Sequence, residues 1–339
     1  MSKPEATIRD IAKILGISKS TVSRALNNHY DVSQETARKV RELAEKIDYQ
    51  PNLLAQHLKQ QRTNTIGVLV PETVNRFTAR ALAGIQEVAD HAGFNVMICQ
   101  SNETLATEQN NLKSLIANRA DGLLISVSRK TDRHEHFQYA IDKAVPIVFF
   151  DRVVEDLNAS QVFSDNYEIS FHGTEHLLAQ GCRRIAYIAG SQHLHIYRNR
   201  LNGYMDALKK HHIPISESLI VYTNYASNDV ANYTRRLFSL RQKPDGIFAL
   251  NDMAALEIIS ILRKRGLKIP EDVAVLGFNN ENICGLIEPT LSSIDHPAFE
   301  MGVAAAEILF KQIANKEIPH EKRMIKSRLV IRESTTRKL

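Results

Sequence analysis

The stretch TIRDIAKILGISKSTVSRALN, residues 7–27, predicts two short helices joined by one tight turn. Its first half places apolar side chains at the helical spacing i, i+3, i+4 and i+7, namely at Ile8, Ile11, Ala12 and Leu15. Its second half repeats an inward apolar face with Val22, Ala25 and Leu26. The stretch therefore favours a helical hairpin with one buried side and one exposed side.

Polar residues mark the ends of these two helices. Thr7, with Asp10 three residues later, can cap the first free N–H groups of the first helix. Gly16 can end that helix, because glycine tolerates the left-handed conformation that a tight exit needs. Ser18 is placed to cap the second helix.

The outer side of the second helix carries short or basic hydrogen-bonding residues, which are Lys19, Ser20, Thr21, Ser23 and Arg24. A helix of this size fits the major groove of DNA, and such side chains suit base edges and phosphates. The pattern favours a DNA-reading helix. A generic helical hairpin is the alternative.

A third helix follows, with Ser33 as its cap and a helical period that runs to Ile47. Pro51 then biases Gln50 away from helix and marks a boundary. Residues 1–62 contain 11 Lys and Arg against 7 Asp and Glu, a net charge of +4, whereas the whole chain carries +5. Nearly all the excess positive charge thus lies on the segment that suits DNA, whose phosphates supply most non-specific affinity.

Residues 51–58, PNLLAQHL, predict a short helix with Leu54 and Leu58 on one face. A helix of two turns is largely unfolded in water by itself, because nucleation is costly, so it needs a partner. The next residues, up to Asn64, are polar and typical of a linker. A frayed extension of the third helix is the alternative.

From Thr65 onward the chain alternates between apolar strands and helices. Expected strands cover 65–70, 94–99, 121–126, 145–151, 161–164, 183–189, 219–222, 245–250, 273–278, 292–295 and 327–334. Expected helices cover 78–92, 105–118, 134–143, 167–180, 200–211, 228–240, 252–265 and 298–314. Continuous apolar strands separated by helices indicate parallel sheets covered on both faces. The alternation of strands and helices begins again near residue 164, which predicts two similar lobes. We expect the chain to cross between them more than once.

Several other classes of protein lack support. No apolar run reaches membrane-spanning length, and the first residues have no hydrophobic signal core, so we expect a cytoplasmic protein without membrane contact. The three cysteines are too far apart in the sequence for metal-ligand spacing, and Cys99 suits packing in a strand. None of the 13 histidines has a third ligand at a spacing typical of a metal site. The paired histidines, which are His134/His136, His193/His195 and His211/His212, suit solvated helix ends or loops. The first strand runs into PETVNRF, not a glycine-rich phosphate turn. We expect no metal, no cofactor and no catalytic residue.

Over almost its whole length the chain resembles transcription regulators of the lactose-repressor/galactose-repressor family. The order and spacing of the matching segments are specific. They are ATIRDIAKILGISKSTVSRALN, YQPNLLAQHLKQQRTNTIGVLVP, RADGLL, FFDR, HLLAQGCRRIAYIAG, RLNGY, PDGIFALND, GLKIPEDVAVLGF and PTLSSIDHP.

The resemblance implies a homodimer that binds a near-palindromic double-stranded DNA operator. Lys19 and Ser20 match the family's specificity-setting pair, and residues 52–58 match its hinge helix, which folds in a pair on the correct DNA. Leu58 matches a leucine wedged between base pairs in the minor groove. The DNA-binding residues carried over are Thr7, Lys19, Ser20, Thr21, Ser23, Arg24, Asn27, Asn52, Ala55, Leu58 and Lys59.

The resemblance also implies a two-lobed module, similar in fold to periplasmic sugar-binding proteins, with a small-molecule effector between the lobes. Its pocket residues by position are Asn75, Arg76, Phe77, Ser126, Asp151, Arg200, Asn251 and Asn279. Arg200 can offer a fork of hydrogen bonds to hydroxyls or a carboxylate, with a helix-surface arginine as the alternative. Phe77 can stack on an apolar sugar face or fill the core.

Two departures from the family pattern bear on the effector. The turn GFNN, residues 277–280, has Asn279 where many sugar-responsive members have aspartate. Arg76 stands where the family often has proline, which adds positive charge. Both favour a sugar acid or sugar phosphate over a neutral sugar. No heptad-patterned tail follows the last strand, so we expect a dimer without a tetramer-forming helix.

The expected fold is α/β, with an N-terminal three-helix helix-turn-helix domain and a two-lobed periplasmic-binding-protein-like domain with parallel sheets. The expected domains are a DNA-binding domain at 1–50, a hinge helix and linker at 51–64, and an effector-binding and dimerisation domain at 65–339. Within the last, lobe 1 covers about 65–163 and 296–326, and lobe 2 about 164–292 and 327–339. The expected function is transcriptional repression under effector control. A ligand-binding or transport receptor is the alternative, which the charge on residues 1–62 disfavours.

Overall fold

The computed structural model describes residues 6–26, 29–49, 62–223 and 229–337. The chain forms two compact units, Met1–Thr63 and Asn64–Leu339. No helix in these ranges is both long enough and apolar enough to cross a membrane.

Unit 1 is built from α1 (Ile8–Leu15), α2 (Lys19–Leu26) and α3 (Gln34–Lys46). Its small core contains the apolar residues expected from the helical spacing, with Ile11, Val22, Ala25 and Val40 fully buried. The backbone of Gly16 is left-handed, with φ of 65°, at the end of α1. The three expected helices are therefore present and pack on one another.

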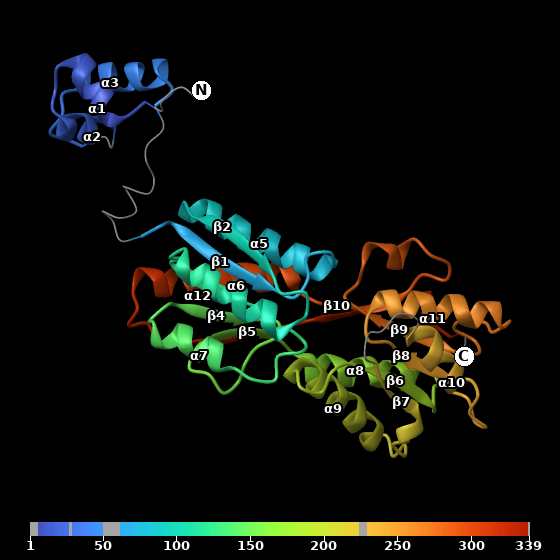
Figure 1. Ribbon diagram of the computed structural model, residues 1–339. Coiled ribbons are helices and arrows are strands. Elements are labelled where there is room, and N and C mark those ends of the chain that lie inside the picture. The colour runs from blue at the N-terminus through green and yellow to red at the C-terminus, as the bar shows by residue number, and fades with distance from the viewer. Residues whose placement is uncertain (1–5, 27–28, 50–61, 224–228, 338–339) are drawn as a thin grey trace. The chain divides into compact units, whose positions relative to one another are not determined.

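Lobe 1 of unit 2 contains a parallel six-stranded sheet in the order β11-β5-β4-β3-β1-β2 (Figure 1). Its strands are β1 (Thr65–Val70), β2 (Asn95–Gln100), β3 (Gly122–Ile125), β4 (Ile147–Phe150), β5 (Ser160–Ser164) and β11 (Lys322–Ile325). Helices α5 (Arg76–Ala92) and α12 (Ala298–Ala314) cover one face. Helices α6 (Leu105–Ala117) and α7 (Glu135–Asp142) cover the other. Both faces of the central strands are therefore buried, which explains their continuous apolar runs.

Lobe 2 contains a second six-stranded sheet in the order β12-β10-β9-β8-β6-β7. Its strands are β6 (Ile185–Ala189), β7 (Ile220–Tyr222), β8 (Gly246–Phe248), β9 (Ala274–Phe278), β10 (Ser292–Asp295) and β12 (Arg328–Val330). Only β12 runs antiparallel to its neighbour. Helices α8 (Asn166–Ala179) and α9 (His195–Lys210) cover one face, and α10 (Asp229–Leu237) and α11 (Asp252–Lys264) cover the other. Short 3-10 helices occupy Glu217–Leu219, Asn282–Gly285 and Glu333–Thr335.

The chain passes between the lobes three times, at 164–166, 295–298 and 325–328. In lobe 1, α5 and α12 approach closely because Gly84 and Gly302 face the opposing helix backbone, which a Cβ at either position would overlap. The carboxyl ends of the parallel strands carry most of the predicted effector residues.

The structure corrects three of the expected elements. β11 was missed, because its residues KRMI alternate in exposure at the edge of the sheet and lack the apolar run of a buried strand. Helix α9 begins at His195, five residues before the expected start at 200. The expected strand 327–334 pairs only over Arg328–Val330 and then becomes a 3-10 helix, whose residues Ser334 and Thr335 are fully buried.

Candidate DNA-reading helix and candidate effector site

Helix α2 is held by its inward residues and by a cap at its start. The Ser18 hydroxyl accepts a hydrogen bond from the Thr21 backbone N–H at 3.1 Å. Val22 and Ala25 are fully buried, which fixes the rotation of the helix. Lys19, Ser20 and Arg24 are consequently exposed, and Thr21 and Ser23 are partly exposed. This is the face that the sequence predicts for contact with DNA.

Arg24 has a partner that the sequence did not reveal. Its Nη1 lies 2.8 Å from Asp31 Oδ2, and Asp31 Oδ1 lies 2.8 Å from His29 Nδ1. This chain of contacts ties the end of α2 to the loop before α3. The guanidinium charge is already shared with a carboxylate, so a phosphate contact by Arg24 would have to compete with Asp31 or share the guanidinium with it.

Thr7 is the N-cap residue of α1, as predicted, and its backbone N–H and its hydroxyl both donate to Asp10 Oδ2, at 2.9 and 2.7 Å. Its contact with DNA stays a prediction. The other predicted DNA-binding residues, Asn27, Asn52, Ala55, Leu58 and Lys59, lie outside the described residues.

Arg200 is buried in lobe 2, so the alternative of a helix-surface arginine is wrong. Only 6% of the residue is exposed. Its Nε donates to Asn166 Oδ1 at 2.6 Å, and its guanidinium carbon lies 3.6 Å from the centre of the Phe278 ring. The hydrogen bond fixes one edge of the planar guanidinium, and the Phe278 ring packs against its flat face. Together the two contacts hold the guanidinium plane in one orientation.

His296 links Arg200 to predicted residues of lobe 1. Its Nε2 lies 2.8 Å from Ser164 Oγ and 4.0 Å from Asp151 Oδ1, and its ring stacks on Phe77 with centroids 4.5 Å apart. Phe278 meets the same ring edge-on. We call Phe77, Asp151, Arg200, Phe278 and His296 the His296 cluster.

Burial sets the charges in the His296 cluster. Burial, together with the charge of Arg200, lowers the pKa of His296 well below its usual value, so the imidazole is neutral at pH 7. Burial raises the pKa of Asp151, against the opposing charges of Arg152 and Arg200. A few polar groups set among aromatic rings are typical of small-molecule sites.

Arg76 connects the two lobes directly, because its Nη1 donates to the backbone oxygen of Asn280 at 2.6 Å. Burial raises the pKa of the nearby Glu281, and the charge of Arg76 opposes this rise. The positive charge of Arg76 is thus partly offset by Glu281, which weakens the sequence argument for an anionic effector. A second contact between the lobes joins Arg198 and Glu155 at 3.4 Å.

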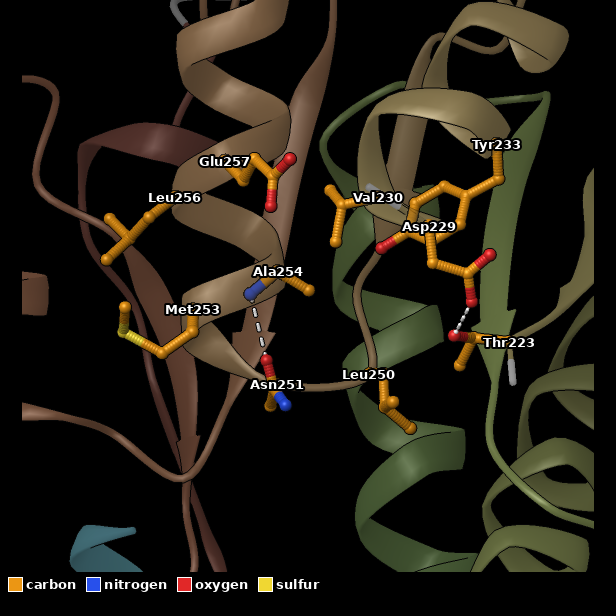
Figure 2. Close-up of a pocket in the computed structure, with 10 residues that line it drawn as sticks. All are labelled: Thr223, Asp229, Val230, Tyr233, Leu250, Asn251, Met253, Ala254, Leu256 and Glu257. Atoms are coloured by element: carbon orange, nitrogen blue, oxygen red, sulfur yellow. Dashed lines mark hydrogen bonds between the residues drawn. The ribbon is translucent and has the colours of Figure 1, made fainter. Parts of the chain in front are cut away.

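The remaining predicted effector residues lie outside the His296 cluster. Asn75 caps α5 and Asn251 caps α11, and each Oδ1 accepts a backbone N–H at 2.8 Å. Asn251 also lines a pocket of about 510 Å³ between α10 and α11, together with Thr223, Asp229, Tyr233 and Glu257 (Figure 2). Ser126 is buried after β3, and Asn279 follows β9 with φ of 103°.

The structure also shows residues that sequence reasoning missed. His296 and Phe278 complete the cluster, and Asn166 orients Arg200. His296 follows the β10 strand SSID directly, so its position after a strand end was a usable signal. Among the described residues, no group of three or more histidines, cysteines, aspartates or glutamates is arranged to hold a metal. His136 is not at a solvated position, because its buried ring bonds to Glu108 at 3.0 Å.

Comparison with known proteins identifies the family. Residues 7–52 match the profile of bacterial regulatory proteins of the lacI family, and residues 174–335 match a periplasmic binding protein-like domain. The ribose operon repressor of Halalkalibacterium halodurans is 30% identical over 329 residues, which cover 97% of each chain. The chain belongs to the lacI family of bacterial regulatory proteins. It is a DNA-binding transcription regulator and not an enzyme.

Other transcription regulators are similar to this chain over nearly its full length. The repressor PurR of Vibrio parahaemolyticus is 29% identical over 98% of this chain and 99% of its own. A complex of the regulator CelR with cellobiose has a TM-score of 0.73 at 26% identity, over 97% of this chain and 100% of that one. The lac repressor dimer bound to operator shares the fold, with a TM-score of 0.88 at 24% identity over 98% and 100%. The expected family and fold are confirmed.

Proposed function

We propose that this protein is a repressor that binds a near-palindromic DNA operator as a homodimer and is controlled by a small molecule bound between its lobes. The observation that carries the proposal is the exposed face of α2, where Lys19 and Ser20 project from a capped helix whose opposite face is buried. Such a helix can enter the major groove without refolding. The net charge of +4 on residues 1–62 supports contact with phosphates.

In this proposal, residues 1–50 read DNA, residues 51–64 form the hinge and linker, and residues 65–339 bind effector and dimerise. Lys19 and Ser20 read bases, while Arg24 and Thr21 position the helix on the backbone. Leu58 enters the minor groove from the hinge. The protein acts in the cytoplasm, where its DNA is.

The effector is a sugar, sugar phosphate or sugar acid that contacts the His296 cluster. Arg200 offers donors to hydroxyls or to an acid group, and Phe77 offers a ring face. Two similar proteins support a sugar, because one is named a ribose operon repressor and the other, CelR, was solved as a complex with cellobiose.

Exposed apolar residues support the homodimer. Leu286, Met253 and Ile283 are 82%, 62% and 41% exposed on or beside α11. Met97 and Ile98 are also exposed, on the edge strand β2. Apolar surface of this kind on a folded protein marks sites of association.

Selection from random DNA sequences tests the DNA-reading assignment. The wild-type protein should enrich one inverted repeat, and the double variant Lys19→Gln, Ser20→Ala should enrich a different half-site, because both side chains meet base edges. Lys39→Gln is the matched control, since Lys39 is exposed on α3 and paired with Glu35, so the consensus should not change. The same consensus for the double variant and the wild type would contradict the assignment.

A further inference from the structure

The turn that follows β9 is held firmly within lobe 2. The Asn280 backbone N–H donates to Ser293 Oγ at 3.0 Å, and the Asn280 side-chain oxygen accepts from Arg332 Nη2 at 2.8 Å. Arg332 is itself fixed, because its Nη1 donates to the Leu291 backbone oxygen and its backbone N–H donates to Ser292 Oγ, both at 2.7 Å. The φ of Asn280 is 51°, in the left-handed region that asparagine adopts more readily than most residues. Contacts inside lobe 2 therefore set the direction of the Asn280 carbonyl.

Arg76 reaches this carbonyl from lobe 1. It is the first residue of α5, and its Nη1 donates to the Asn280 backbone oxygen at 2.6 Å. A hydrogen bond from a charged donor is shorter and stronger than one between neutral groups. Helix α5 is anchored in lobe 1, since Gly84 lets it pack closely against α12. The bond thus joins two firmly held parts, one in each lobe.

The other ion pair between the lobes is weaker. Arg198 and Glu155 approach to 3.4 Å, and their side chains are 47% and 52% exposed. Such exposed pairs contribute little, because water and salt screen the charges. Arg76 is partly buried and its acceptor is already in place, so its bond loses less to screening and to side-chain ordering.

Lobe 1 connects this bond to the linker. Strand β1 begins at Thr65, directly after the predicted linker, and it lies between β3 and β2 in the sheet of lobe 1. Residues 71–75 then lead from the other end of β1 to Arg76. A change in the orientation of lobe 1 relative to lobe 2 therefore also moves the point where the linker enters lobe 1.

We propose that the bond from Arg76 to the Asn280 carbonyl is a latch that holds the two lobes in one arrangement without help from an effector, and so sets the operator affinity of the unliganded repressor. Both partners are groups of the protein, so the latch acts at any effector concentration. An effector that favours another arrangement has to offset the energy of this bond, whereas one that favours the same arrangement meets a site already assembled. The statement on operator affinity rests on the proposed function, and the latch itself does not.

Distances between the lobes of the full-length protein test the latch without DNA or effector. Spin labels are attached at Lys113→Cys in α6 and Lys209→Cys in α9, two exposed sites, in a Cys99→Ser background that leaves only buried cysteines. An excess of unlabelled chain leaves one labelled chain in each dimer, and pulsed electron resonance then gives the distance between the lobes. The wild-type latch should give one narrow distribution, and Arg76→Met should add a second one. Arg76→Lys should restore part of the first, because an ammonium group can also donate to a carbonyl.

Arg80→Met is the matched control, since Arg80 is an exposed arginine one turn further along α5. It should give the same distance distribution as the wild type. The latch is overturned if Arg76→Met also gives the wild-type distribution, or if Arg80→Met changes it as much as Arg76→Met does.

Operator affinity tests the regulatory role, with the inverted repeat that the wild type selects as the probe. Arg76→Met should change this affinity about three- to tenfold, as expected for the loss of a partly exposed hydrogen bond from a charged donor. The sign of the change shows which arrangement of the lobes binds the operator, and Arg80→Met should have no effect. A changed distance distribution with unchanged operator affinity would overturn the regulatory role. If the wild type selects no repeat, the proposed function fails, while the distance measurement still decides on the latch.

Discussion

Asp252 shows how one buried residue shapes the candidate effector site. Its carboxylate is fully buried at the start of α11, where Oδ1 accepts from the Ser293 hydroxyl at 2.5 Å and Oδ2 from the Glu281 N–H at 2.7 Å. The Ser293 oxygen in turn accepts the Asn280 N–H at 3.0 Å. Asp252 thus holds the turn that carries Asn279. Gly277 has no side chain here because a Cβ would overlap the carboxylate.

The charge on Asp252 predicts a pH dependence of stability. Burial raises its pKa to about 6, although the hydrogen bonds oppose the rise. Because the folded pKa exceeds the unfolded value of 3.8, the folded state holds the proton more tightly. The contribution of Asp252 to stability is therefore complete below pH 3.8. It falls by about 3 kcal/mol as the pH rises to about 6.

Urea unfolding of the wild type and of Asp252→Asn at several pH values checks this prediction. The wild type should lose stability relative to the variant as the pH rises from about 4 to about 6. Asp206→Asn is the control of opposite sign, because a hydrogen bond from Lys209 lowers the pKa of the exposed Asp206. If the difference in free energy of unfolding between the wild type and Asp252→Asn does not change over this pH range, the role of Asp252 is refuted.

At the scale of elements, short helices depend on what packs against them. α1 and α2 have 8 residues each and are stable because their apolar faces share one core with α3. The predicted helix at 52–58 is as short, and family resemblance gives it a partner only on DNA. We therefore expect the free energy that stabilises this helix to come from its contacts in the operator complex.

Leu58→Ala tests the hinge. We expect operator affinity to fall by more than about tenfold, because truncation of a leucine in a filled site costs roughly 2 kcal/mol or more. The DNA kink should also be lost, which gel mobility of circularly permuted operator fragments measures. Effector affinity should be unchanged. Gln61→Ala, in the linker, is the control, and an unaltered bend in Leu58→Ala would exclude the wedge.

At the scale of the whole molecule, an effector can change the arrangement of the two lobes relative to each other. The bond between Arg76 and Asn280, the pair Arg198–Glu155 and the His296 cluster all join lobe 1 to lobe 2. A ligand that binds one arrangement of the lobes more tightly shifts the protein towards it. The shift in operator affinity is limited by that difference in ligand affinity.

A thermal-shift screen of neutral sugars, sugar phosphates and sugar acids tests this mechanism. A true effector should raise the melting temperature of the wild type and change its operator affinity. Arg200→Ala should lose both responses yet still bind operator, because Arg200 lies in unit 2. Lys209→Ala, an exposed lysine of the same helix, should respond as the wild type does. Stabilisation by neutral sugars alone would refute the preference for an anion, and an unimpaired Arg200→Ala would refute the assigned site.

The sequence by itself determined the features that depend on interactions between residues close together in the chain. The apolar spacing in residues 7–27, the caps at Thr7 and Ser18, and the apolar strands from Thr65 onward are features of neighbouring residues, and these specified the helices and the largely parallel sheets. The family followed from the resemblance of whole segments, taken in their order. Exposure of Lys19 and Ser20 followed from the same spacing.

The tertiary structure decided what depends on residues far apart in the chain. His296 stacks on Phe77, Arg200 lies over Phe278, and β11 pairs with β5 although its sequence lacks an apolar run. The pairing of Arg24 with Asp31 and the bond from Arg76 to Asn280 belong to the same class. Such contacts have no local signature, because they arise only when chain crossings bring distant strand ends, loops and helix ends together.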